Sequence, residues 1–77
     1  MPTILEIFGF RFFFYSNEHP AIHVHAEKSD GEAKIELEPF VRVVKNNGLK
    51  RQELRKAVRL AKMFKSDFIA EWHKIFG

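Results

Sequence analysis

Three histidines gather in a short segment near the start of the chain, and residues of this type at this spacing could do chemistry. His23 and His25 are separated by one residue, and His19 precedes them. Imidazole titrates near neutral pH, so it can act as a general acid or base. It is also a common ligand for divalent transition metals. The segment therefore suggests acid–base chemistry or metal binding, beside a purely structural role.

The pattern around these histidines predicts a β-hairpin with two distinct faces. Side chains alternate across a strand, so a strand over residues 22–28 places His23, His25 and Glu27 on one face. The other face is apolar and packs with the apolar face of the preceding strand. This apolar set comprises Phe10, Phe12, Phe14, Ile22, Val24 and Ala26. A slip of one residue would drive the histidines into the core, so the pattern selects this register.

The favoured register pairs the residues of the second face of the sheet with one another. Between the first two strands the expected pairs are Tyr15–His23, Phe13–His25 and Arg11–Glu27. A four-residue turn to the third strand then gives the pairs Glu27–Lys34 and His25–Glu36. The resulting surface is half aromatic and half ionisable, and no segment of the sequence is an obvious cover for it.

Three hypotheses compete for this second face. As a catalytic site, His23 or His25 would act as acid or base on a phosphodiester, as in a ribonuclease-like toxin with or without a metal. Arg11 would then steady phosphate charge, and Tyr15 would position the substrate. As a metal site, His23, His25 and Glu36 would hold a divalent ion, with His19 as the candidate fourth ligand. As an interface, the aromatic residues would meet another protein chain.

A second candidate site is a run of basic residues in the second half of the chain. Arg51, Arg55, Arg59 and Lys62 follow one another at steps of four, four and three. On a helix they form one exposed stripe, opposite the apolar residues Leu54, Val58 and Ala61. Such a stripe is typical of binding to a phosphate backbone, and it suits an acidic protein partner equally well. Like charges at this spacing repel, which favours a functional anionic partner.

The elements that position these residues change type once along the chain. The hydrophobic period is about two before residue 49 and about 3.6 after it. We expect strands over 4–15, bent or interrupted at Gly9, and over 22–28, 33–37 and 40–44, the last at an edge. Residues 29–31 form a turn in which Gly31 adopts positive φ. Residues 50–76 form a helix that breaks near Ser66, where Ser66 or Asp67 caps a second helix.

The predicted fold class is therefore α+β. It has an antiparallel sheet of three to four strands, with one face covered by the C-terminal helix, either kinked or as two short helices. Seventy-seven residues make a single domain over 1–77, with 1–48 β-rich and 49–77 helical. Neither a membrane span nor a signal peptide is recognisable, so we expect a cytoplasmic protein. The absence of cysteine excludes disulfides and thiolate sites. No cofactor is expected, apart from a divalent metal.

Charge is unevenly distributed between the two halves. Residues 1–38 contain three basic and seven acidic residues, a net charge of −4, whereas residues 39–77 contain ten basic and three acidic residues, a net charge of +7. This asymmetry favours an anionic partner for the second half, either nucleic acid or an acidic protein. It also allows the acidic half of one copy to meet the basic half of another. This charge asymmetry, together with exposed Phe13 and Tyr15 and a small core, favours a homodimer.

The arrangement of these motifs resembles a bacterial family called domain of unknown function 4160. The resemblance is carried by GFRFFFYSNEHPAIHVHAE, by GEAKIEL and by a helical tail with the late Trp72. The family usually has two prolines between its first and second histidines, whereas this chain has Pro20 followed by Ala21 and Ile22. The resemblance implies a component of a toxin–antitoxin-like pair and implies no activity. The predicted function is an interaction module that binds nucleic acid or an acidic partner through the basic helix, and the ribonuclease-like toxin is the alternative.

Overall fold

The order of elements separates a β half from a helical half. The computed structural model describes residues 3–15 and 21–77. Within these residues the elements are β1 (Thr3–Ile7), β2 (Phe10–Phe13), β3 (His23–Lys28), β4 (Gly31–Glu36), β5 (Arg42–Asn47), α1 (Arg51–Met63) and α2 (Lys65–Phe76). None of the helices in this part of the chain is long and apolar enough to cross a membrane.

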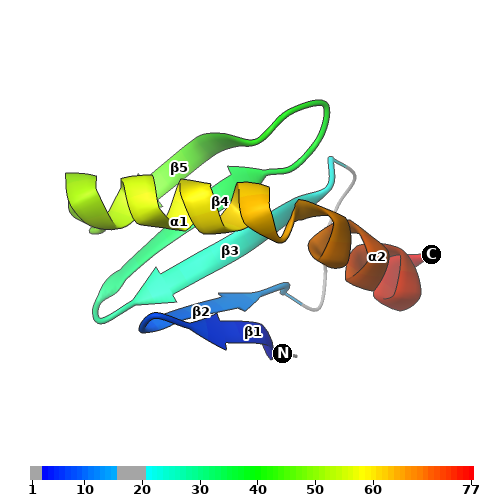
Figure 1. Ribbon diagram of the computed structural model, residues 1–77, viewed down its shortest axis with the longest axis horizontal. Coiled ribbons are helices and arrows are strands. Elements are labelled where there is room, and N and C mark those ends of the chain that lie inside the picture. The colour runs from blue at the N-terminus through cyan, green and yellow to red at the C-terminus, as the bar shows by residue number, and fades with distance from the viewer. Residues whose placement is uncertain (1–2, 16–20) are drawn as a thin grey trace.

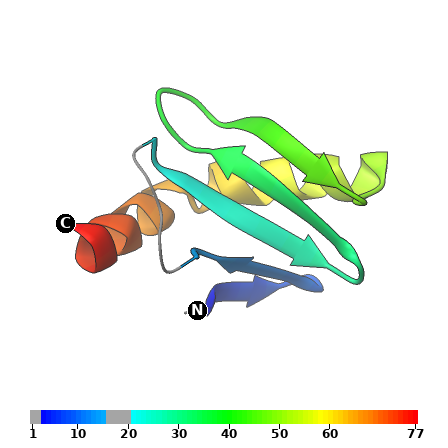
Figure 2. The same ribbon diagram turned by 180° about the vertical axis from the view of Figure 1, so that it is seen from behind.

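All strands belong to one antiparallel sheet, whose order is β1-β2-β3-β4-β5. Both helices lie on the same side of the sheet, and the view from behind shows the other face without a helix over it (Figures 1 and 2). The predicted α+β class is confirmed. The expected number of strands was wrong, because five strands are present in the described residues instead of three or four.

The extra strand arises at Gly9. Phe8 has φ of 53° and Gly9 has φ of 82°, and together they form a two-residue turn between the paired residues Ile7 and Phe10. Two positive φ values fit the right-handed twist of a hairpin, so the chain reverses there instead of bending. The single strand expected over 4–15 is therefore the hairpin β1–β2.

The turn between β3 and β4 is also shorter than expected. Lys28 pairs with Gly31, so the turn contains only Ser29 and Asp30, and Ser29 is the residue with positive φ. Gly31 is the first residue of β4 instead of a turn residue. The shorter turn moves the register of β4 by two residues relative to the prediction, while every β4 side chain keeps its expected face.

The helical half breaks at Phe64, two residues before the expected position. Phe64 has φ of −105° and ψ of 16°, and it lies between α1 and α2. No side chain caps the second helix, so the expected capping by Ser66 or Asp67 was wrong. The predicted pair of short helices is otherwise present, and the second helix buries Phe68 and Trp72.

The core lies between the sheet and the two helices. The rings of Phe12 and Phe68 are 5.2 Å apart, and those of Phe14 and Trp72 are 5.3 Å apart. The apolar face predicted for the hairpin is thus the core face, where Phe10, Phe12, Phe14, Val24 and Ala26 are buried. On α1 the buried residues are Ala57, Leu60 and Ala61. Leu60, which is not among the apolar residues expected opposite the basic stripe, therefore belongs to the core.

Two turns meet at the end of the sheet from which α1 starts. Gly31 and Gly48 lie in contact, and a Cβ built on Gly31 would lie 2.7 Å from the backbone nitrogen of Leu49. Asn46 fixes the second turn: its Nδ2 donates to the carbonyl oxygen of Leu49 at 3.0 Å, and its Oδ1 accepts from the Leu49 N–H at 3.1 Å. These contacts fix where α1 begins relative to β4 and β5.

Candidate functional site

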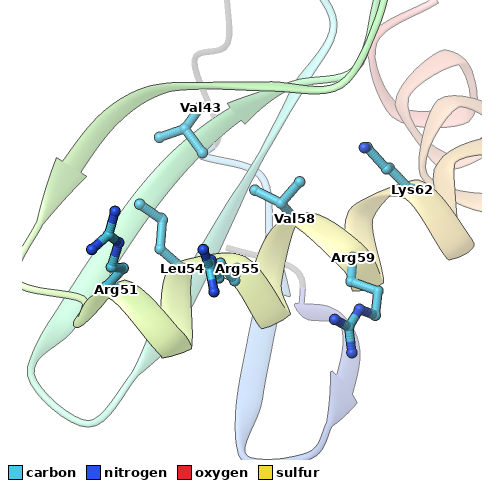
Figure 3. A pocket seen from close by; sticks show the side chains of 7 residues that line it. All are labelled: Val43, Arg51, Leu54, Arg55, Val58, Arg59 and Lys62. Atoms are coloured by element: carbon cyan, nitrogen blue, oxygen red, sulfur yellow. The ribbon is translucent and has the colours of Figure 1, made fainter.

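The four basic residues predicted as a binding stripe line a common groove between α1 and β5. The groove has a volume of about 580 Å³. Val43 lines it from β5, and the remaining lining residues all come from α1 (Figure 3). Those α1 residues are Arg51, Leu54, Arg55, Val58, Arg59 and Lys62. The structure thus places side by side the four basic residues that the sequence predicted as one stripe.

The groove combines an aliphatic lining with basic side chains. Leu54 and Val58 are half-buried and extend towards β5, and Val43 lies across from them (Figure 3). The sequence placed Leu54 and Val58 on the side of the helix opposite the basic stripe. In the structure they flank the stripe, because the buried side of α1 is centred on Ala57, Leu60 and Ala61. The aliphatic lining was therefore missed as part of the candidate site.

The electrostatic character of the groove is positive without local compensation. None of the described residues that line it is acidic, and all four basic side chains are exposed. Within residues 3–15 and 21–77, none of the four has a carboxylate within salt-bridge distance. Glu53, the acidic residue in the first turn of α1, instead accepts a hydrogen bond from the Lys50 backbone N–H at 2.9 Å. The groove is therefore suited to an anionic ligand.

The basic side chains extend to both sides of α1. Lys62 extends towards β5, whereas Arg59 extends to the opposite side of the helix (Figure 3). Lys56 lies further round on that side, where its Nζ is 4.8 Å from the centroid of the Phe8 ring. The positive surface therefore continues from the groove across the outer side of α1 towards the β1–β2 turn.

The second candidate site, on the other face of the sheet, has the predicted register between β2 and β3. Arg11 pairs with Glu27, and Phe13 pairs with His25. The Arg11 Nε donates to Glu27 Oε1 at 3.0 Å, and the guanidinium lies 4.2 Å from the centroid of the Phe13 ring. The Phe13 ring stacks on the His25 imidazole at 5.4 Å. These pairs are confirmed.

The expected partners of the histidines on β4 were wrong. His25 lies opposite Lys34 instead of Glu36, and His23 lies opposite Glu36, because the β3–β4 turn has two residues instead of four. The expected Glu27–Lys34 pair is likewise absent, since Glu32 lies opposite Glu27. Ring contact also brings Tyr15 to His25, at 4.3 Å between centroids.

Glu32 joins Tyr15 and His25, although the sequence prediction assigned it no role. The Tyr15 hydroxyl donates to Glu32 Oε2 at 2.6 Å, and His25 Nδ1 lies 3.5 Å from the same oxygen. The two-residue turn is what brings Glu32 to this position. A two-residue turn over Ser29 and Asp30, had it been predicted, would have placed Glu32 near Tyr15 and His25 from the sequence alone.

The second face is less open than the sequence suggested. Phe13 is 1% exposed, His23 is 4% exposed and His25 is 6% exposed. His23 packs beside Trp72 of α2, with 5.3 Å between the rings, and its Nδ1–H donates to the Ala21 carbonyl oxygen at 2.8 Å. Of the predicted catalytic residues, Tyr15 is the most exposed, at 37%. The idea of an uncovered face was therefore wrong for both imidazoles.

Among the described residues, the predicted metal ligands are not gathered into a metal centre. Glu36 Oε1 accepts a hydrogen bond from Arg42 Nε at 2.8 Å, which directs this carboxylate towards β5. In the described part of the chain, no group of three or more His, Asp or Glu side chains could hold a metal ion. His19, the candidate fourth ligand, lies outside the described residues. His73 is exposed on α2.

Comparison with known proteins gives one family. A family model described as a domain of unknown function, DUF4160, matches residues 9–73 of the chain. The match covers most of the sheet, α1 and the greater part of α2. Nothing among the curated proteins or the solved structures matches the chain.

Proposed function

The chain belongs to the DUF4160 family, whose description states no activity, and we propose from its geometry that it is an interaction module that binds nucleic acid. Binding takes place along the basic surface of α1, defined by Arg51, Arg55, Arg59 and Lys62. The observation that carries this proposal is that all four basic residues border one groove, whose lining contains no acidic residue, and that their positive surface continues across the outer side of α1. A role in a toxin–antitoxin-like pair, which the resemblance implies, belongs to the same proposal.

The spacing of the basic residues supports a phosphate backbone as the ligand. Residues four apart on an α-helix are separated by about 6 Å along its axis. Arg51, Arg55 and Arg59 therefore present an even row of charges, and a nucleic acid strand carries an equally regular row. Arginine contacts phosphate oxygens through two parallel hydrogen bonds, which adds geometric specificity to the attraction.

The absence of an acidic partner within the groove supports a functional role for the charges. Like charges four residues apart on a helix destabilise it by a few tenths of a kcal/mol per pair. Nothing in the described part of the groove offsets this repulsion. An anionic ligand would remove it and would release counterions from the nucleic acid backbone at the same time.

The ribonuclease-like alternative has no comparable support. Its acid or base would be His23 or His25, and both imidazoles are buried. A phosphodiester would have to reach them past Tyr15 and Trp72, which lie against their rings. The geometry therefore favours binding over catalysis.

The proposal is tested by fluorescence anisotropy with labelled single-stranded and duplex oligonucleotides, of both DNA and RNA, over a series of salt concentrations. The variant with Arg51→Gln and Arg55→Gln removes two charges from exposed positions, so the fold should persist. We expect at least a tenfold loss of affinity. The slope of log K against log salt should fall by about 0.7 to 0.9 for each phosphate that the variant no longer neutralises.

The matched control is Lys74→Gln, which removes a charge from α2. Lys74 is 76% exposed and pairs with Glu71 at 3.6 Å, away from the groove. It should bind like the wild type. Failure of the wild-type protein to bind any oligonucleotide in a salt-dependent manner would overturn the proposal and favour an acidic protein as the ligand of the groove. An equal loss of log affinity for each charge removed in the two variants would overturn the assignment to the groove, because net charge alone would then explain binding.

A further inference from the structure

The turn between β1 and β2 contains a residue that its backbone does not favour. Phe8 adopts φ of 53°, in the left-handed region, and Gly9 follows it with φ of 82°. Turns with two positive φ values prefer Asn-Gly, Asp-Gly or Gly-Gly, because a bulky side chain is strained in this conformation. Phenylalanine at the first position therefore costs stability that asparagine would not.

Packing does not compensate for this cost. Phe8 is 61% exposed, whereas the neighbouring Phe10 is 1% exposed and belongs to the core. The ammonium of Lys56 lies 4.8 Å from the centroid of the Phe8 ring. A strained and exposed aromatic side chain points to a role outside the fold.

Two lysines lie close to the Phe8–Gly9 turn, and Glu6 and Arg11 line a shallow hollow beside it. Lys56 lies over the ring from α1, and Lys28 lies beside Gly9, with its Cε 3.4 Å from a Cβ built there. The β1–β2 hairpin and β5 lie on opposite sides of α1 (Figure 1). Arg59 extends towards the side away from β5 (Figure 3). A positive surface therefore leads from the groove, across the outside of α1, to an exposed aromatic ring.

We propose that Phe8 is a stacking residue for an unpaired base of a single-stranded nucleic acid. This inference rests on the proposed function, because the phosphates of the same strand would lie on the basic surface of α1. Single-strand binding proteins combine a positive track for the backbone with aromatic rings on which bases stack. The ring of Phe8 supplies the stacking surface, and Lys56 and Lys28 supply the charges beside it. A duplex keeps its bases paired and stacked, so it would not use Phe8.

The test exploits the strain at Phe8. Phe8→Asn creates the turn sequence that this backbone prefers, so the midpoint of thermal unfolding should stay the same or rise. Binding is measured by fluorescence anisotropy with a labelled oligothymidylate and with an abasic oligomer of the same length. We expect Phe8→Asn to bind the oligothymidylate about 5- to 150-fold more weakly, the range found for loss of one stacked base. Its affinity for the abasic oligomer should equal that of the wild type.

Two further variants complete the test. Phe40→Asn is the matched control, because Phe40 is 62% exposed in the loop between β4 and β5. This loop lies at the end of the sheet opposite the β1–β2 turn (Figure 1). It should bind both oligomers like the wild type. Phe8→Trp should retain tight binding of the oligothymidylate, because it keeps an aromatic surface.

The outcomes separate this inference from the proposed function. If Phe8→Asn binds the oligothymidylate like the wild type while Arg51→Gln with Arg55→Gln binds weakly, stacking by Phe8 is overturned and the basic groove stands. An equal loss on the abasic oligomer would also overturn stacking, since no base is present there. If the wild type binds neither oligomer, the proposed function is overturned, and so is the stacking role of Phe8 that rests on it.

Discussion

At the scale of single residues, the second face of the sheet is stabilised by contacts among its own side chains. Arg11 lies over Phe13, Phe13 stacks on His25, and Tyr15 packs against the same imidazole edge to face. Alternation along the strands predicted which residues share this face. It could not predict that they would bury one another, because burial depends on how long side chains fold down onto their neighbours.

The packing of His25 gives a prediction for stability. We expect His25→Ala to lower the free energy of unfolding by about 2 to 4 kcal/mol, because it removes a buried ring from between two aromatic rings. Urea denaturation followed by circular dichroism measures the change. His73→Ala, at an exposed position, should shift it by less than about 0.5 kcal/mol. Equal effects of the two variants would show that the ring contacts at His25 carry little stability.

At the scale of elements, turn length decided what could be predicted. The strand periods and the change to a helical period were readable from the sequence, and they led to the correct fold class and the core face of the hairpin. The Phe8–Gly9 turn was predicted as a bend, and the Ser29–Asp30 turn was predicted two residues too long. Those two errors account for the missing strand and for the wrong partners on β4, since a hairpin register follows from its turn.

The contact between two turns gives a prediction at this scale. In Gly31→Ala the new methyl group would lie 2.7 Å from the backbone nitrogen of Leu49. The backbone of Leu49 cannot move away without displacing the start of α1. We expect a loss of about 1 to 3 kcal/mol in the free energy of unfolding, measured by urea denaturation. Gly77→Ala is the control, because a Cβ there meets nothing within 4 Å, so its loss reports only the strain of an alanine at φ of 92°. A Gly31→Ala protein as stable as the control would mean that the two turns separate at little cost.

At the scale of the whole molecule, the uneven charge of the two halves bears on self-association. The homodimer expected from the sequence rested partly on an exposed Phe13, and Phe13 is buried. The exposed Tyr15, the small core and the opposite charges of the two halves remain as the basis of the expected homodimer. The basic groove was readable from the sequence at this scale, because charge and helical period together place Arg51, Arg55 and Lys62. The aliphatic lining was not, since Val43 comes to the groove from a different element.

The self-association is testable by sedimentation equilibrium. At low salt we expect an apparent mass of about twice the chain mass of 9.1 kDa, because the acidic half of one copy attracts the basic half of another. At about 1 M salt the Debye length falls to about 3 Å, and the mass should fall towards that of one chain. A single-chain mass at both salt concentrations would contradict the dimer. A dimer that persists at high salt would point to an apolar interface instead.

The strand order β1-β2-β3-β4-β5 has a kinetic consequence. Every strand pairs with its neighbour in the chain, so each pairing closes only a short loop and loses little chain entropy. Folding rates rise as contacts become more local in sequence. The sheet can therefore grow by adding one hairpin at a time, without a search for distant partners. This order of assembly would complete the β5 side of the groove before α1 docks beside it.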